Sequence, residues 1–239
     1  FMIFIAPDKA EIYPEKLPKH IKVSPDADKS RAEEFRDYIN ENTDVKVIYP
    51  KDELIKSRKY TAEEALYYPL DTHWNQLGAY VGTRCLVEKL GLDMPKLNDV
   101  KYRRNNAENF GLPGMLGIRN MKPNGFSYDV CGYEGNSRLL EYDGARSNEV
   151  RIKTENALSD KKIMFLRDSF FTAMEPYVGA CFGEVYAPHY TLVYDAGMID
   201  KEKPDIVVLE VVERSLDIIT YTDIIPYSSE SVWDRFNPE

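Results

Sequence analysis

The residues of this chain that could do chemistry lie in two short segments that are far apart in the sequence. The first segment, residues 67–75, contains Asp71 and His73, and His73 is one of only three histidines. In the second segment, residues 163–171, an apolar series ends in an aspartate followed by Ser169. A serine nucleophile, a histidine base and an aspartate that orients the histidine are the parts of a hydrolytic triad. We therefore predict that Asp71, His73 and Ser169 act together as catalytic residues.

A lone histidine is more often structural than catalytic, so the neighbours of His73 matter. In an extended segment, residues i and i+2 point the same way, which would let Asp71 reach Nδ1 of His73 and leave Nε2 as the base. The alternative is that Asp71 only caps the following helix, and the spacing alone favours neither. Asn75 can cap that helix and is also a candidate for supporting the site. Trp74 is a candidate for contacting substrate.

Ser169 also has a structural interpretation, because serine often caps a helix at its N-terminus. The two roles are compatible: a serine that opens a helix lies beside free backbone N–H groups, where an oxyanion is stabilised. Residues 109–117 are rich in glycine but lack the spacing of a phosphate loop. They would provide either a sharp turn or an oxyanion-hole amide, with Gly111 and Gly114 as the candidates.

Short apolar segments alternate with helical ones, which predicts an α/β fold with a mostly parallel sheet between layers of helices. Ser30 and Glu33 have the spacing of a capping box. Glu210, Glu213 and Arg214 are predicted to follow the last strand, where they could face a ligand, but an exposed salt bridge is the favoured interpretation. A strand over residues 66–70 would deliver Asp71 to the edge of the sheet. The other predicted strands are residues 2–6, 45–49, 162–166, 181–186 and 205–209, and the predicted helices are residues 30–42, 52–58 and 75–90.

The whole chain, residues 1–239, is expected to be a single catalytic domain with an irregular insertion over about residues 99–160. Within the insertion, residues 137–142 are predicted to pair with residues 149–154 as a hairpin. Tyr102 and Tyr128 belong to its tyrosine-rich surface and are candidates for stacking on sugar rings. A protein interface is the alternative role for such a surface.

The composition narrows the classes of protein to which the chain can belong. Its net charge is −9 at pH 7, and nucleic-acid binding needs a basic face, so we expect no nucleic-acid partner. No apolar run reaches the length of a membrane span. The three cysteines are scattered, which predicts neither a zinc site nor a disulfide framework. The chain opens directly in an apolar strand, so we expect a truncated N-terminus that hides any signal peptide or anchor.

Several blocks of the chain, taken in order, resemble the SGNH-hydrolase-like domain of the alginate O-acetyltransferase family. The most specific block is Asp71-Thr72-His73-Trp74, which precedes the serine as in that family and unlike the order in ordinary SGNH esterases. Arg167 departs from the small residue that is more usual before Asp-Ser, so we consider it a candidate for supporting the oxyanion. The resembling blocks are residues 6–9, 13–18, 71–74, 111–117, 167–170, 203–210 and 213–214.

The resemblance implies a flavodoxin-like three-layer sandwich, a triad of Asp71, His73 and Ser169, an acetyl-serine intermediate and no cofactor or metal. It implies an O-acetyltransferase or O-acetylesterase that acts outside the cytoplasm on a cell-surface or secreted polysaccharide. The partners would be the polysaccharide acceptor and an acetyl donor, for which a membrane acetyl-transfer protein is one candidate. The glycan, the donor, the balance of transfer and hydrolysis and the oligomeric state stay open.

Two other functions fit the same residues. The first is a non-catalytic protein for glycan binding or polysaccharide assembly that keeps the fold. The second is a metal-dependent hydrolase with Asp71 and His73 as ligands, for which only His20 and His189 remain as further histidines. A compact cluster of ligands is missing from the sequence, so we rank the metal enzyme last.

Overall fold

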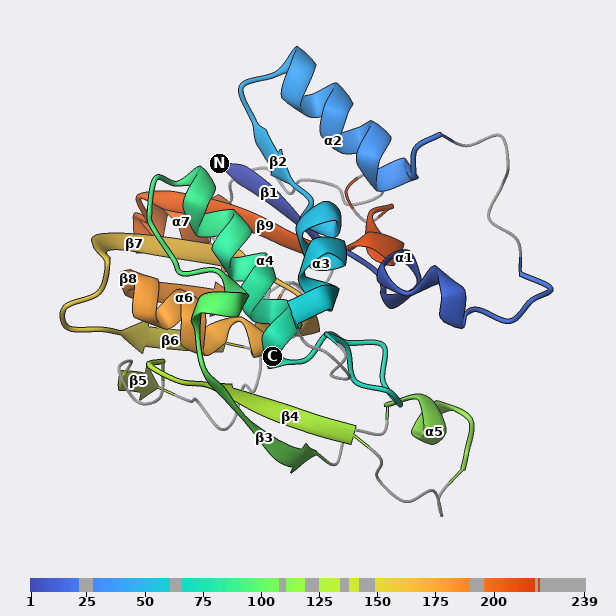
Figure 1. Ribbon diagram of the computed structural model, residues 1–239. Helices are drawn as coiled ribbons and strands as arrows, with labels where there is room; N and C mark the ends of the chain where they lie inside the picture. Colours follow the sequence, from blue (N-terminus) through green and yellow to red (C-terminus); the bar gives the residue numbers. More distant parts are fainter. Residues whose placement is uncertain are drawn as a thin grey trace, which may run out of the picture.

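We describe the fold from a computed structural model of the chain (Figure 1). Its central feature is a sheet whose described part has seven strands in the order β2-β1-β9-β7-β8-β6-β5. Neighbouring strands from β2 to β8 are parallel, whereas β6 and β5 are antiparallel to their neighbours. The structure describes residues 1–21, 28–60, 66–107, 111–118, 125–133, 138–141, 149–189, 196–217 and 219.

The helices lie on both faces of this sheet, so the predicted three-layer α/β sandwich is confirmed. The last strand of the described residues, β9, lies between β1 and β7 in the middle of the sheet. The sheet strands are β1 (Met2–Ala6), β2 (Lys46–Ile48), β5 (Arg138–Glu141), β6 (Glu149–Lys153), β7 (Ser159–Leu166), β8 (Phe182–Pro188) and β9 (Ile206–Val212). The α-helices are α1 (Lys9–Ile12), α2 (Arg31–Asn42), α3 (Lys51–Ser57), α4 (Gln76–Lys89), α5 (Gly111–Met115), α6 (Glu175–Cys181) and α7 (Ala196–Glu202).

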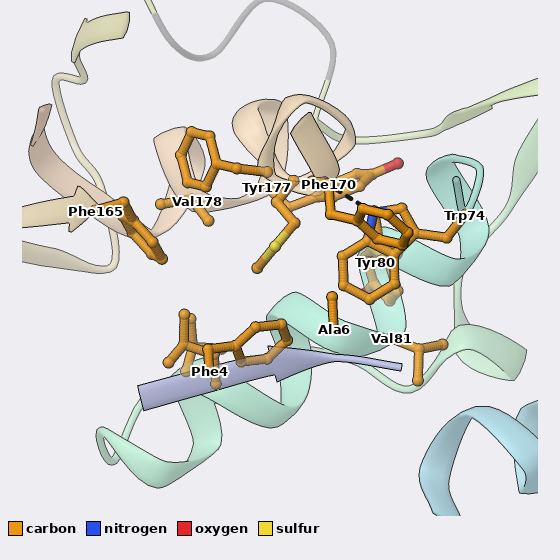
Figure 2. Close-up of a cluster of buried hydrophobic side chains, with 14 of the residues drawn as sticks. Phe4, Ala6, Trp74, Tyr80, Val81, Phe165, Phe170, Tyr177 and Val178 are labelled. Atoms are coloured by element: carbon orange, nitrogen blue, oxygen red, sulfur yellow. Dashed lines mark hydrogen bonds between the residues drawn. The ribbon is translucent and has the colours of Figure 1, made fainter. Parts of the chain in front are cut away.

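Each face of the sheet has its own hydrophobic core, because successive side chains of a strand point to opposite faces. On β1, Phe4 packs into the core under α3, α4 and α6, whereas Ile5 packs into the core under α2 and α7. The first core is rich in aromatic residues, and Figure 2 shows Phe4, Trp74 and Phe165 within it. Five of the six predicted strands and all three predicted helices are present, with ends shifted by at most three residues.

The predicted strand over residues 66–70 is wrong. This segment is a loop that turns back on itself, with a single bridge between Tyr67 and Trp74. Its backbone groups bond within the loop: the Tyr68 N–H donates to the His73 carbonyl at 3.2 Å, and the Asn75 N–H donates to the Leu66 carbonyl at 2.9 Å. Leu66, Tyr67 and Tyr68 are apolar because this part of the loop is buried, not because it belongs to the sheet, whereas Pro69 is exposed.

The insertion contains two strand pairs among its described residues. The predicted hairpin is confirmed, since β5 pairs with β6 in antiparallel fashion, and this pair extends the central sheet. A separate hairpin joins β3 (Tyr102–Ala107) to β4 (Gly125–Val130). This second hairpin lies beside α4, where the Tyr128 N–H donates to Oε1 of Gln76 at 3.1 Å. The insertion therefore touches the N-terminal end of α4.

That end of α4 is held close to the buried loop by Asn75 and Gly78. Asn75 caps the helix as predicted, and its Oδ1 accepts the N–H groups of Leu77 at 3.0 Å and Gly78 at 3.2 Å. A Cβ atom at Gly78 would lie 2.4 Å from the Leu66 carbonyl oxygen and 2.9 Å from Cβ of Trp74. Such distances are too short for any side chain, so the close approach requires glycine.

We predict that Gly78→Ala destabilises the protein by about 1–3 kcal/mol through overpacking, although alanine favours a helix over glycine by about 1 kcal/mol. Gly114→Ala in α5 is the matched control, because a Cβ there meets no heavy atom within 4 Å. Urea unfolding measures both changes. Superimposable curves for the two variants would show that the helix does not need this close approach.

Candidate active site

Asp71, His73 and Ser169 lie in a row at the carboxyl-terminal edge of the parallel strands. The Nδ1 atom of His73 is 2.6 Å from Oδ1 of Asp71, and its Nε2 atom is 2.7 Å from Oγ of Ser169. A carboxylate accepts hydrogen bonds, so the network assigns the ring proton to Nδ1 and leaves the Nε2 lone pair facing the serine hydroxyl. This arrangement can withdraw a proton from Ser169.

Asp71 is held by a tight turn and not by the extended geometry that we predicted. Its Oδ1 also accepts the backbone N–H of His73 at 2.9 Å, and its Oδ2 accepts the Gly111 N–H at 3.1 Å. Burial alone would raise the pKa of Asp71, but the hydrogen bonds from His73 and Gly111 outweigh it and hold the pKa below its ordinary value. Asp71 is therefore a carboxylate at neutral pH. It does not cap α4, because Asn75 does.

Lys9 holds the loop that carries Asp71. Its ammonium group donates to the carbonyl oxygens of Tyr68 at 2.7 Å, Pro69 at 2.9 Å and Asp71 at 3.2 Å. Burial lowers the pKa of Lys9, and the charge of Asp71 partly offsets that effect. Tyr67 adds a second tie, since its hydroxyl donates to the Pro7 carbonyl at 2.7 Å. The loop is thus fastened to the segment that follows β1.

Ser169 is held by the sheet. It is the first residue of a short 3-10 helix, η4 (Ser169–Ala173), that follows β7, and Asp168 is the N-cap. Oδ1 of Asp168 accepts the Phe170 N–H at 2.7 Å, and Oδ2 accepts the Val212 N–H at 2.8 Å. The Asp168 N–H in turn donates to Oε2 of Glu210 at 2.8 Å. Ser169 is therefore fixed relative to β9, because the N–H and the carboxylate of Asp168 both form hydrogen bonds with residues of that strand.

Aromatic packing joins the histidine loop to the serine turn. The His73 ring lies 4.8 Å from the Phe170 ring, and the Arg214 guanidinium lies 5.2 Å from the same ring. Nε1 of Trp74 donates to the Phe170 carbonyl at 2.8 Å, the bond drawn in Figure 2. Arg214 also pairs with Asp8. The exposed salt bridge predicted for Glu210, Glu213 and Arg214 is therefore corrected, because Oε2 of Glu213 accepts the Asp8 N–H at 3.0 Å and Glu210 is fully buried.

Two of the predicted substrate residues are corrected by their burial. Trp74 is fully buried, so it positions Phe170 and cannot stack on a substrate. Tyr128 is buried with 2% of its surface exposed, and its ring lies 5.7 Å from the ring of Tyr102. Tyr102 is partly exposed at the edge of the core. Tyr128 belongs to the hydrophobic core and Tyr102 packs against it, so packing gives both tyrosines a role without a sugar.

The predicted supporting residues have other tasks in the structure. The Gly111 amide already donates to Asp71, and a Cβ at this position would lie 2.6 Å from Oδ2 of Asp71, so Gly111 supports the aspartate and not an oxyanion. Asn75 caps α4. Gly114 is exposed in α5, and no hydrogen bond joins it to the triad within the described residues. Arg167 is buried, and its Nη1 lies 3.4 Å from the Asp168 carbonyl oxygen.

Lys9 and Phe170 were not predicted as residues of the site, and Glu210 was predicted to follow the last strand, whereas it lies within β9. A signal for Lys9 was present, because it follows a strand whose carboxyl end lies at the edge where α/β sites form. Glu210 lies inside an apolar strand, and a buried carboxyl group needs a specific partner. Among the described residues, no group of three or more histidine, cysteine, aspartate or glutamate side chains is placed to hold a metal ion.

Comparison with known proteins identifies the relatives of this fold. Residues 1–117 match the family model described as the SGNH hydrolase-like domain of the acetyltransferase AlgX. The predicted family resemblance is confirmed. No curated protein matches the chain significantly.

Solved structures with the same fold extend over most of the chain. A DHHW family protein from Eubacterium siraeum has a TM-score of 0.65 at 17% identity, covering 94% of this chain and 83% of its own. PatB1 from Bacillus cereus has a TM-score of 0.62 at 20% identity, covering 90% and 83%. The O-acetyltransferase domain of AlgJ from Pseudomonas putida has a TM-score of 0.54 at 15% identity, covering 95% and 79%. At these identities the likeness to the solved structures establishes the fold alone. It extends past residue 117, where the match to the AlgX family model ends.

Glu210 leads to a prediction about pH. Complete burial and the neighbouring charge of Asp168 raise the pKa of Glu210 well above its ordinary value. The folded protein therefore keeps a proton that the unfolded chain releases above about pH 4.3. The stability that this proton supports is complete below that pH and is lost as the pH rises toward the folded pKa.

We predict that Glu210→Gln removes this loss, so the wild type weakens relative to the variant between pH 5 and pH 8 by up to about 1.4 kcal/mol per pH unit. Urea unfolding at several pH values measures it. Glu202→Gln is the control, because its hydrogen bond to Arg151 lowers the pKa of Glu202 to about 2 and it does not titrate in this range. Parallel pH profiles for wild type and Glu210→Gln would mean that Glu210 is ionised in the folded protein.

Proposed function

We propose that the protein is a serine-dependent O-acetyltransferase or O-acetylesterase that acts on a polysaccharide. The observation that carries this proposal is the row formed by Asp71, His73 and Ser169, in which Nε2 of His73 lies 2.7 Å from the serine Oγ. The match of residues 1–117 to an acetyltransferase family supports the acetyl group as the one transferred. The fold shared with the O-acetyltransferase domain of AlgJ agrees with it.

The proposed reaction has two halves. In the first, Oγ of Ser169 attacks the carbonyl carbon of an acetyl ester while its proton passes to Nε2 of His73. The tetrahedral oxyanion collapses, the donor alcohol takes the proton back from Nε2 and leaves, and Ser169 carries the acetyl group. In the second half, His73 withdraws a proton from an acceptor hydroxyl, which attacks the acetyl carbon; the bond from that carbon to Oγ breaks, and Nε2 returns the proton to Oγ of Ser169. Asp71 stabilises the imidazolium in both halves.

The backbone N–H of Ser169 is our candidate for the first oxyanion donor. It lies at the start of η4, and within the described residues no hydrogen bond occupies it. Free N–H groups at such a turn carry partial positive charge toward a developing oxyanion. Gly111 cannot supply the second donor while it holds Asp71. The second donor would therefore come from another part of the site or from the substrate.

The acceptor in this proposal is a hydroxyl group of a cell-surface or secreted glycan, and the reaction takes place outside the cytoplasm. The match to the AlgX family model is what supports a polysaccharide as the acceptor. A separate acetyl donor, such as a membrane acetyl-transfer protein, would load Ser169. No helix among the described residues is long and apolar enough to cross a membrane. Transfer and hydrolysis use the same residues and differ in how well the site excludes water.

A non-catalytic glycan-binding protein is the second candidate function. The short distances along the triad oppose it, because a binding site has no need for a histidine lone pair aimed at a serine hydroxyl. The burial of Trp74 and Tyr128 also removes two of the aromatic faces on which sugar rings would have stacked.

We predict that Ser169→Ala and His73→Ala each lower turnover of a small acetyl ester by a factor on the order of 10³ or more. The double variant should lose little beyond either single one, since the triad acts as a unit. Asp71→Asn should cost less, because the carboxylate transfers no proton. Thr172→Ala is the control: this exposed residue lies in the same 3-10 helix, and no hydrogen bond joins it to the triad among the described residues. Additive losses in the double variant would contradict a shared mechanism.

Acid quenching during turnover provides a direct test of the intermediate. In the wild type, the peptide that contains Ser169 should carry the mass of one acetyl group. A larger fraction of this peptide should be acetylated in Asp71→Asn if that change slows deacylation more than acylation. Adding an oligosaccharide with free hydroxyls should shorten the life of this species and yield an acetylated sugar. An enzyme that turns over the ester without ever carrying the acetyl group would exclude the covalent route.

A further inference from the structure

Arg214 contacts three segments that together form the candidate site. It lies in a short 3-10 helix, η5 (Glu213–Ser215), that follows β9. Its Nη1 pairs with the Asp8 carboxylate, and its Nη2 lies 3.5 Å from Oγ1 of Thr72. Its guanidinium carbon lies over the Phe170 ring, 5.2 Å from the ring centre. One side chain thus joins the segment after β1, the histidine loop and the serine turn.

Two of these contacts adjoin the proposed base. Thr72 directly precedes His73 in the chain, and the Phe170 ring lies 4.8 Å from the His73 ring. Phe170 is 1% exposed, whereas 42% of the Arg214 side chain is exposed, so the guanidinium lies on the solvent side of the ring. The position of the imidazole therefore depends on two neighbours that Arg214 itself contacts.

An exposed ion pair usually contributes little to stability, and that is the simplest role for Arg214. Its contacts exceed what an ion pair needs. Within the described part of the chain its hydrogen bonds go to two segments, and its guanidinium carbon lies over an aromatic ring of a third. A planar guanidinium can donate in several directions and still contact an aromatic ring, whereas a lysine ammonium is a point charge. This combination of contacts therefore requires arginine.

We propose that Arg214 is a positioning residue for His73, which it holds through Phe170 and Thr72. The inference rests on the proposed triad mechanism, in which Nε2 of His73 takes the proton of Ser169. The reacting atoms must be held closely, since a misplacement of about 1 Å can cost on the order of 100-fold in rate. Without the guanidinium, the Phe170 ring loses its contact on the solvent side and the Thr72 hydroxyl loses this donor, so the imidazole can turn away from the serine.

Steady-state kinetics on a small acetyl ester test the proposal. Arg214→Ala should lower kcat about tenfold to hundredfold and leave KM within about twofold, because a positioning residue affects the proton transfer and not substrate binding. Arg31→Ala is the matched control, since it removes another exposed arginine that pairs with an aspartate, Asp217. The control should leave both constants unchanged. A kcat equal to that of the wild type, or a rise in KM alone, would overturn the proposal.

Arg214→Lys separates position from charge. Lysine keeps the positive charge but lacks the planar group, so it cannot replace the contacts with Thr72 and Phe170 together. Its kcat should stay within about threefold of that of Arg214→Ala. Urea unfolding should show that each variant is folded under the assay conditions, so that lost activity is not lost fold. A wild-type kcat in Arg214→Lys would mean that the charge alone suffices, and the positioning role would be wrong.

Crystal structures of the wild type and Arg214→Ala provide a readout that needs no activity. In the variant, the Phe170 and His73 rings should be displaced or occupy a second conformation, with Nε2 of His73 beyond the hydrogen-bond limit of about 3.2 Å from Oγ of Ser169. Rings in unchanged positions would overturn the proposal. A wild type that does not turn over acetyl esters would contradict the proposed function separately, and the two structures would still decide whether Arg214 positions His73.

Discussion

The site depends on one constraint: Asp71 and His73 lie on a loop and not on a strand, so contacts from outside the loop must hold them. The ammonium group of Lys9 bridges three carbonyl oxygens of this loop, and Gly111 contributes an N–H to the Asp71 carboxylate. Each bond is worth only about 0.5–3 kcal/mol on balance, but together they select one conformation of the turn. Within that turn Asp71 can accept from both the backbone and the ring of His73.

The serine half of the site is built differently. Ser169 comes three residues after the end of β7, and the capping carboxylate of Asp168 bonds to β9, so the proposed nucleophile is tied to the sheet. Phe170 connects the two halves, because its ring contacts His73 and its carbonyl receives the Trp74 indole N–H. A rigid nucleophile and a base fastened by many small contacts would keep the reacting atoms in register, a requirement for proximity catalysis.

Much of this arrangement could be predicted from the sequence, for identifiable reasons. Strands β1 and β9 could be predicted because both of their faces are covered, which makes their sequences apolar throughout. The start of α2 could be predicted because Ser30 forms a capping box with Glu33. The strand predicted before Asp71 was wrong because a buried loop and a buried strand are equally apolar. What separates them is the destination of their backbone hydrogen bonds, and no local pattern records it. The burial of Tyr128 was not predicted for a related reason. The number of aromatic residues in a segment does not reveal which face of a hairpin packs against the rest of the protein.

Charge placement near Ser169 adds a final requirement. Ser169, the proposed nucleophile, is next to Asp168, and the buried Glu210 accepts the Asp168 N–H. Two ionised carboxylates there would oppose the oxyanion that the proposed reaction builds at Ser169. The raised pKa of Glu210 keeps that residue neutral, while its Oε2 still accepts the Asp168 N–H. Asp168 can then devote both of its oxygens to the Phe170 and Val212 amides. The buried acid thus stabilises the serine turn without adding a second negative charge where one would slow the reaction.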